Sequence, residues 1–353
     1  MKGARFGWAR TWFDRGIAAC AVGYPLTLAL IWTGLRFIGE SWWVTSVGLY
    51  LPLALLGAPL PLLAAALWWR RRRRLLTLQL VSLCLLLFPL LGLTLNWPSG
   101  AAKPTGGLRL VSYNVNSGNG GFDLITEEIM RRDPDVAFVQ EIPFWVASKL
   151  TERLKVSLPH TREDTEFLVA SKYPIIAAEY PPNLHFFGRE RHPRFVRVVL
   201  DTPLGPTVFY HVHTVSPRGA FYALRGEGLR REITSGRLLT GARAASLREH
   251  AALRELQVET VAKRALEEQG PVVIVGDTNL PIQSPIRHRY LDRFQDGFRE
   301  AGLGFGNTFP SRSPWMRIDV VLASESLRFT RFEVGESRAS DHRSIVVDLA
   351  KAK

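Results

Sequence analysis

The sequence has only two cysteines among its 353 residues, Cys20 and Cys84, and both lie in apolar stretches. Residues 98–353 contain none, which excludes a disulfide framework or a cysteine-ligated zinc site from that part of the chain. With so few cysteines, their number does not indicate whether the protein works in an oxidising or a reducing compartment.

Acidic residues are scarce in the first 97 positions, where Asp14 and Glu40 face ten Lys and Arg residues, a net charge of +8. The remaining 35 basic and 30 acidic residues contribute only +5 of the total of +13. A strongly basic chain suggests nucleic-acid binding. Here most of the excess belongs to the N-terminal third, where a membrane explains it better.

Long apolar runs fill that N-terminal third, and each is about long enough to cross ~30 Å of hydrocarbon. We expect three transmembrane helices, at about 17–38, 44–69 and 75–96. Tryptophans stand at the ends of the runs, where interfacial aromatic residues belong. The sequence lacks a convincing small-residue cleavage site after the first run, which argues against a cleaved signal peptide.

The basic residues in the first 97 positions predict how the three expected transmembrane helices are oriented in the membrane. Four precede the first run, the arginines at 70–74 separate the second run from the third, and the loop between the first two runs carries only Glu40. By the positive-inside rule, the N-terminus is cytoplasmic and everything after Trp97 lies outside the cytoplasm, in the periplasm or on the outer surface. A nucleic-acid or anionic-lipid patch is the less favoured explanation of the arginine run. Residues 98–107 predict a flexible linker.

Residues 108–353 contain many short apolar strand patterns and few helical ones, with no internal repeat. Such a pattern predicts an α+β sandwich, in which two β-sheets pack face to face with helices outside. The expected helices cover 122–132 and 246–270, the second opened by a capping-box spacing from Ser246 to Glu249. The expected strands are 108–114, 136–141, 167–171, 195–200, 207–213, 272–275, 318–322, 327–334 and 344–349.

Polar residues stand at the ends of these otherwise apolar strands. Each alone has an ordinary structural explanation, such as an Asx turn at Asp277 or a satisfied interior histidine at His213. Together they are improbable in a sandwich without a site. The set is Asn114, Glu141, His213, Asp277, Asn279, Asp319, Asp341 and His342.

The motifs around these residues resemble those of the endonuclease/exonuclease/phosphatase superfamily, in the same order, over about residues 108–350. The resemblance implies a four-layer α/β/β/α sandwich of two packed mixed β-sheets flanked by helices, here preceded by the three expected transmembrane helices. One departure is Thr278, where the family commonly has Phe. The motifs are Tyr113–Asn114, Gln140–Glu141, Val212–His213, Gly276–Asn279, Arg317–Asp319 and Ser340–His342.

The resemblance and the chemistry of the groups together imply roles. Asn114, Glu141 and Asp341 would hold a divalent metal, and all-oxygen ligation suits Mg²⁺ or Mn²⁺. His213 and Asn279 would donate hydrogen bonds to the phosphoryl oxygens. His342, oriented by Asp319, and Asp277 are two candidates for activating the water, and the sequence does not choose between them or between one metal and two.

The substrate has to be inferred from local features, because the fold class does not choose it. Residues 218–254 hold eight arginines and three glutamates, which suits anionic headgroups as well as nucleic acid. We expect a membrane-anchored phosphoesterase that acts outside the cytoplasm on a lipid-linked phosphate or pyrophosphate. Resemblance to family members with three spans suggests polyprenyl-pyrophosphate phosphatases linked to glycopeptide resistance.

An extracytoplasmic nuclease that cleaves DNA or RNA is the alternative enzyme. A catalytically inactive binding module on a membrane anchor is a third hypothesis, and the complete set of acids and histidines argues against it. The bilayer and a phosphate-containing substrate are the expected partners, and the sequence identifies no protein partner.

Overall fold

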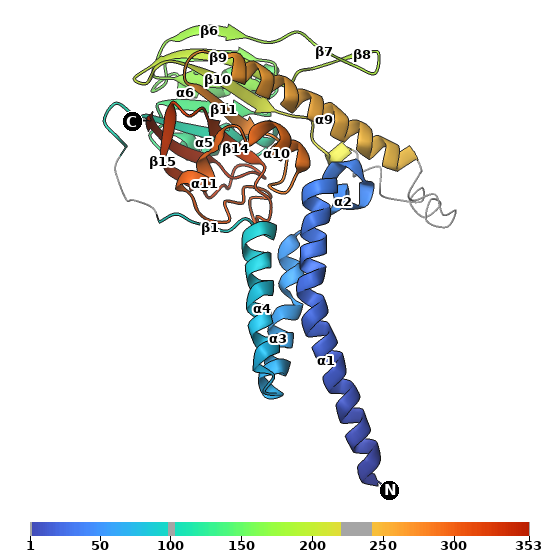
Figure 1. Ribbon diagram of the computed structural model, residues 1–353. Helices are drawn as coiled ribbons and strands as arrows, with labels where there is room; N and C mark the ends of the chain where they lie inside the picture. The colour runs from blue at the N-terminus through green and yellow to red at the C-terminus, as the bar shows by residue number, and fades with distance from the viewer. Residues whose placement is uncertain (1, 98–102, 220–241, 353) are drawn as a thin grey trace.

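The computed structural model describes residues 2–97, 103–219 and 242–352. A bundle of helices from the N-terminal part projects from one side of a β-rich domain (Figure 1). Most of the basic stretch at 218–254 lies outside the described residues. The elements of the bundle are α1 (Lys2–Thr33), η1 (Gly34–Ile38), η2 (Gly39–Ser41), α2 (Trp43–Gly48), η3 (Leu53–Gly57), α3 (Pro59–Trp69), α4 (Arg73–Leu85) and η4 (Leu86–Leu90).

Two helices in the described part of the chain are long and apolar enough to cross a membrane, Trp12–Ser41 and Arg73–Leu90. Only 17% and 22% of their most apolar windows are buried within the protein, so they are not core helices of the domain. Large apolar side chains such as Leu30 (73% exposed) and Leu62 (74% exposed) cover the outside of the bundle.

The expected middle span over 44–69 is not one continuous helix, so the prediction of three such helices is corrected to two. Helix α2 ends at Gly48, and the apolar helix that follows, Leu53–Trp69, is shorter than the other two. Pro52 lies in the break, where its missing N–H and fixed φ interrupt a helix. The expected third span also ends early, since Thr94–Leu95 form a short strand, β1.

Two six-stranded sheets form the β-rich domain. The first has the order β12-β14-β11-β10-β9-β6, and the second has the order β15-β16-β2-β3-β5-β4. The strands of the first are β12 (Gln295–Asp296), β14 (Asp319–Ala323), β11 (Val272–Asp277), β10 (Gly205–His213), β9 (Phe195–Thr202) and β6 (Ile175–Glu179). Those of the second are β15 (Leu327–Val334), β16 (Ile345–Lys351), β2 (Leu108–Asn114), β3 (Val136–Gln140), β5 (Phe167–Ser171) and β4 (His160–Asp164).

Three apolar clusters hold these layers together. The central cluster lies between the sheets and includes Phe138 of β3 and Phe209 of β10, whose ring centroids are 5.0 Å apart. A second cluster packs the outer face of the β2 and β3 sheet against α5 (Phe122–Met130) and α6 (Phe144–Leu154). A third packs the β10 and β11 sheet against helices α9 (Ala242–Glu267) and α10 (Pro285–Leu291). The α/β/β/α sandwich is therefore confirmed.

Most expected strands appear within a residue or two of their predicted bounds, whereas the helices are less well predicted. Helix α9 (Ala242–Glu267) already includes Ser246, so the predicted capping box does not begin it. The sequence did not predict helices α6, α10 (Pro285–Leu291) and α11 (Gly297–Ala301) or strands β4, β6 and β12. It also did not predict two small strand pairs, β7 (Leu184–Phe186) with β8 (Arg189–Arg191) and β1 with β13 (Leu303–Gly304).

Strand direction brings the polar strand ends to one edge. Strand β2 is parallel to β3, and β10 is parallel to β11. A hydrogen bond from Asn114 at the end of β2 to Asp277 at the end of β11 shows that both pairs end on the same side. Strands β14 and β16 are antiparallel to β11 and β2, so they begin there. Gly276 is required in this arrangement, because its φ is 131° and a Cβ would lie 2.1 Å from the Val212 carbonyl oxygen.

The helical bundle and the β-rich domain share polar contacts. Ser284 donates to the Glu40 carboxylate, and the Gln283 side chain donates to the Leu90 carbonyl. The Tyr50 hydroxyl donates to the Asn279 carbonyl at 2.9 Å. Because these groups are largely buried, the two parts form a packed junction rather than a domain on a loose tether.

Asp296 forms ion pairs with a cluster of buried arginines beside this junction. It accepts from Arg287 at 2.8 Å and lies 3.6 Å from Arg317, and both arginines are 4% exposed. Burial alone would raise the pKa of Asp296, but Arg317 and Arg287 lower it to about 2. We expect Asp296→Asn to lower the free energy of unfolding by about 3 kcal/mol, because two buried guanidinium groups lose their counter-charge.

The pH dependence of this effect follows from the lowered pKa. A carboxyl whose pKa falls on folding stabilises the protein above its unfolded value of 3.8, and this stabilisation is lost as the pH drops through about 2. Thermal unfolding of the full chain in detergent should therefore separate wild type from Asp296→Asn at pH 7 and show a shrinking difference below pH 4. The exposed Asp201 provides a control, and an Asp201→Asn effect of the same size would contradict the argument.

Candidate active site

Asn114 and Glu141 reach the site from neighbouring strands of the second sheet. Asn114 is the last residue of β2, and Glu141 follows β3 directly, with a left-handed φ of 60°. That conformation is costly for a glutamate and directs the backbone away from the strand path. The Asn114 amide donates to Asp277 Oδ2 at 3.2 Å, which joins the two sheets at this edge.

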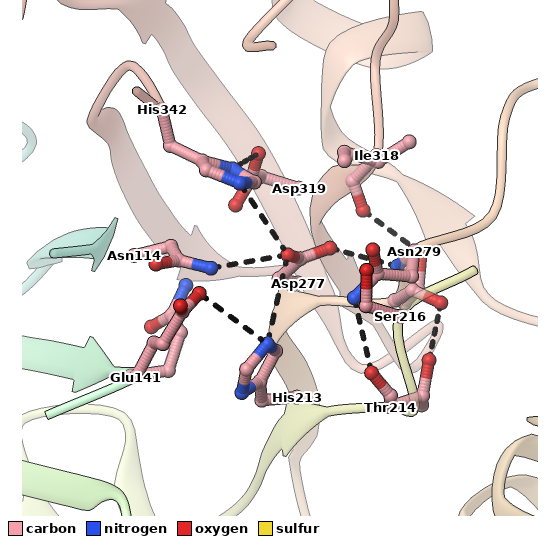
Figure 2. Close-up of polar contacts among 12 residues, drawn as sticks. Asn114, Glu141, His213, Thr214, Ser216, Asp277, Asn279, Ile318, Asp319 and His342 are labelled. Atoms are coloured by element: carbon pink, nitrogen blue, oxygen red, sulfur yellow. Dashed lines mark hydrogen bonds and ion pairs between the residues drawn. The ribbon is translucent and has the colours of Figure 1, made fainter. Parts of the chain in front are cut away.

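His213, Asp277 and Asp319 come from three adjacent strands of the first sheet. The strand register pairs Asp277 with His213 on one side and with Asp319 on the other. His213 Nε2 lies 3.7 Å from Glu141 and 4.0 Å from Asp277. Figure 2 shows the side chains of Asn114, His213 and His342 pointing toward the Asp277 carboxylate.

His342 is held between two carboxylates. Its Nδ1 lies 2.9 Å from Asp319 Oδ2, and its Nε2 lies 3.7 Å from Asp277 Oδ2. Thr308 also donates to Asp319 at 2.6 Å, which fixes that carboxylate. Burial alone would lower the pKa of His342, but Asp319 and Asp277 raise it to about 9. His342 therefore carries a positive charge at neutral pH in this arrangement.

Asp277 is almost completely buried and receives donors from several sides. Besides Asn114, the backbone N–H of Asn279 donates to its Oδ1 at 2.7 Å. Burial, with the nearby Asp319, raises the pKa of Asp277 to about 6. A carboxyl of this kind is ionised at neutral pH yet basic enough to take a proton from a positioned water.

Asn279 adopts a left-handed φ of 50°, which asparagine tolerates better than most residues. Its side-chain amide donates to the Thr214 carbonyl at 3.0 Å. Thr278, the departure from the family motif, is buried and donates from its hydroxyl to the Ile318 carbonyl at 2.9 Å. It therefore contacts backbone rather than the acids and histidines of the site.

Asp341 lies on the same loop as His342 but makes a different contact. Its carboxylate pairs with Arg218 at 3.0 Å, and no hydrogen bond or ion pair joins it to Asn114 or Glu141 within the described residues. The neighbouring Ser340 hydroxyl donates to the Asn114 carbonyl at 2.7 Å, so the loop does lie beside that residue. The predicted ligand set of Asn114, Glu141 and Asp341 therefore stays a prediction.

Glu166 was missed by the sequence analysis. Its carboxylate accepts a hydrogen bond from His213, whose Nδ1 lies 2.9 Å away. Burial alone would lower the pKa of His213, but this hydrogen bond raises it. Glu166 also pairs with Arg194 at 3.0 Å. Its one sequence signal was its position before a predicted strand, which here runs antiparallel to β3 and so begins at the active edge.

The residues present fit a hard divalent cation. The carboxylates of Asp277 and Asp319 belong to a buried cluster with His342, in which one atom of each residue lies within 4.8 Å of the others. Asn114 contacts Asp277, and Glu141 lies beside His213. Asp319 Oδ1 is buried without a hydrogen-bond partner in the described part of the chain. Buried carboxylates crowded in this way repel each other, and a cation relieves that repulsion. Oxygen-rich donor sets favour Mg²⁺ or Mn²⁺ over softer metals.

A cavity of about 350 Å³ opens beside His342 and Asn279. Apolar side chains form most of its wall, among them Phe309, Trp315 and Met316. Tyr50 also lines it, although Tyr50 lies in the break of the helical bundle. The bundle therefore contributes to the pocket next to the catalytic groups, which the sequence did not indicate.

A buried set of carboxylates, amides and histidines at one edge of a four-layer sandwich defines a metal-dependent hydrolase of phosphoester bonds. The model of the endonuclease/exonuclease/phosphatase family matches residues 111–342, and the chain belongs to this family. The predicted family resemblance is thus confirmed. No curated protein sequence matches the chain closely enough to count as a relative.

The chain is similar to solved structures at low sequence identity, and the first of those that follow shares its fold. An endonuclease/exonuclease/phosphatase from Beutenbergia cavernae is 18% identical, with a TM-score of 0.54 over 70% of this chain and 72% of that one. A mannosyl-6-phosphatase from Bacteroides thetaiotaomicron is 15% identical, with a TM-score of 0.47 over 69% and 99%. A humanized TDP2 from D. rerio is 14% identical, with a TM-score of 0.46 over 70% and 100%.

Proposed function

We propose that this protein is a membrane-anchored phosphoesterase that hydrolyses a lipid-linked phosphate or pyrophosphate outside the cytoplasm. The observation that carries the proposal is the shared pocket, in which Tyr50 of the bundle lines a largely apolar cavity beside His342. An apolar group attached to the phosphate suits such a wall, and a substrate in the bilayer is held near the site at high effective concentration.

The positions of the basic residues support the proposed orientation. The loop at Arg70–Arg74 lies at the end of the bundle far from the β-rich domain (Figure 1). Arg70 donates to Asp14 at 2.6 Å, so the beginning of α1 is at that same end. If this basic end is cytoplasmic, the catalytic domain is on the opposite side. A reporter fused after Lys353 tests this, since it should be active only outside the cytoplasm.

Within the proposed mechanism, a bound Mg²⁺ or Mn²⁺ supplies positive charge to the phosphoryl oxygens. Glu141, Asn114 and Asp341 are the residues we expect to hold it. His213 and Asn279 donate to the phosphoryl oxygens, and Asp277 accepts a proton from the attacking water. We assign His342 as a donor rather than a base, because Asp319 and Asp277 flank its ring and keep it protonated.

The activity test uses the full chain in detergent or nanodiscs, because the bundle forms part of the pocket. With Mg²⁺ or Mn²⁺ added, it is offered a polyprenyl pyrophosphate, a phosphodiester lipid, a soluble phosphomonoester, plasmid DNA and RNA. Asp277→Ala and His342→Ala serve as blanks. We expect release of phosphate from the lipid. Nicking of plasmid or RNA without lipid turnover, steeply reduced by salt, would instead establish the nuclease alternative.

Trp315 provides a test of the apolar wall. We expect Trp315→Ala to raise KM for the lipid-linked substrate about tenfold, because loss of a buried aromatic contact weakens binding by about 1.5 kcal/mol or more. The rate with a soluble phosphomonoester should change little, since Trp315 donates to the Tyr50 carbonyl and not to a catalytic group. Trp145→Ala, which removes a 69% exposed tryptophan, is the matched control. Equal KM changes for both substrates would contradict the assignment of the wall.

A further inference from the structure

A second cavity, of about 460 Å³, lies where the helical bundle meets the β-rich domain. Its walls come from the end of the first apolar helix, from residues 88–95 and from the loop and helix around Ile282 and His288. None of the residues that line it lines the catalytic pocket. We call it the junction cavity, and it is separate from the site of hydrolysis.

Positive charge exceeds negative charge around the junction cavity. Arg36, Arg299 and Arg317 line it, and Arg36 has no hydrogen bond or ion pair among the described residues. Arg317 is 4% exposed, and its Nε and Nη1 are buried without hydrogen-bond partners within the described ranges. Asp296 is shared by Arg287, Arg317 and Arg299, so one carboxylate faces three guanidinium groups.

The other wall of the junction cavity is apolar and belongs to the membrane side. Trp32, Phe88, Pro89, Leu93 and Leu95 line it, and Phe88 is 45% and Leu95 63% exposed. Both helices that could cross a membrane reach this level, one ending at Ser41 and the other at Leu90. The cavity thus has Arg299 and Arg317 on the domain side, Arg36 at the end of the first membrane helix, and most of its apolar side chains on the bundle side. It lies at the level where both membrane helices end.

We propose that the junction cavity binds the headgroup of an anionic phospholipid, whose acyl chains lie along the two membrane helices. The arginines meet the lipid phosphate, and the apolar wall selects a lipid over a soluble anion. The lipid joins the ends of both helices to the domain and so holds the shared catalytic pocket at the membrane surface. This inference rests on the anchoring part of the proposed function but not on the identity of the substrate.

The test measures lipid binding by the full chain in a neutral detergent. Dioleoyl phosphatidylglycerol, dioleoyl phosphatidylcholine or inorganic phosphate is added, and retained lipid is counted by native mass spectrometry. We expect retention of phosphatidylglycerol alone, together with slower hydrogen exchange in residues 86–95 and 282–291. Arg36→Gln and Arg299→Gln should each weaken this retention about fivefold, the effect of one arginine at an anionic surface.

Arg72→Gln is the matched control, because it removes the same charge at the far end of the bundle. If it weakens retention as much as Arg36→Gln, the attraction is a general surface effect and the proposed site is wrong. Equal binding of phosphatidylcholine, or the same exchange protection by inorganic phosphate, also overturns the proposal. Because this experiment measures no turnover, a failure to retain the lipid leaves the proposed activity standing. Conversely, a protein that retains the lipid but hydrolyses no substrate refutes the proposed activity and not the lipid site.

Discussion

Replacing Asp277 with asparagine should lower kcat for phosphoester hydrolysis about 10³-fold, the middle of the range for loss of a general base. Asp277 is buried at the meeting point of Asn114, His213 and His342, and in the part of the chain that the structure describes no other carboxylate contacts all three. The amide keeps the shape of the side chain but accepts no proton. Steady-state rates of the full chain with a soluble phosphomonoester give the measurement.

The change at Asp277 should lower kcat more than it raises KM, because a base acts in the transition state. Asp201→Asn, on the exposed side of β9, should leave the rate unchanged. Circular dichroism and thermal unfolding establish that the variant is folded. A folded Asp277→Asn protein with more than about a tenth of the wild-type rate would move the role of base elsewhere, with His342 the remaining candidate.

Glu141→Gln should both lower activity and raise the Mg²⁺ concentration needed for half-maximal rate, each on the order of 100-fold. Glu141 stands next to His213 at the exit of β3, and a carboxylate there supplies a negative oxygen that an amide lacks. The measurement is a Mg²⁺ titration of the rate after treatment with EDTA, which should itself abolish activity reversibly.

The control for Glu141 is Glu152→Gln on α6, an exposed glutamate away from the site. Mg²⁺ at high concentration should restore part of the rate of Glu141→Gln, whereas it should restore none of the rate of Asp277→Asn. A Mg²⁺ dependence identical to that of wild type would remove Glu141 from the metal site and leave the buried carboxylates of Asp277 and Asp319 as the candidate ligands.

Most of the sandwich was predictable because its strands are short apolar runs with their own boundaries. The run at 272–275, for example, appears as β11 (Val272–Asp277). The prediction of a membrane helix over 44–69 was wrong because composition shows how long an apolar run is but not whether its helix is continuous. Pro52 breaks its helix, and the break places Tyr50 against Asn279 rather than in a continuous span.

Glu166 and Tyr50 could not be found by pattern, for a common reason. Each acts through a contact with a residue far away in the sequence, His213 in one case and Asn279 in the other. A glutamate in a turn between two strands has the local pattern of a solvent-exposed residue. Only the pairing of β5 with β3, together with the packing of the two sheets, places it beside the histidine.

The sequence by itself determined three features of this protein: the polar residues at the strand ends, the apolar character of the first 97 residues and the family motifs. Tertiary structure decided which of those residues face one another. Two parallel strand pairs and two antiparallel neighbours bring Asn114, Asp277 and His342 to a single edge. The reason is physical: side-chain periodicity is a local property, whereas strand order and register arise from contacts between segments that are distant in the sequence.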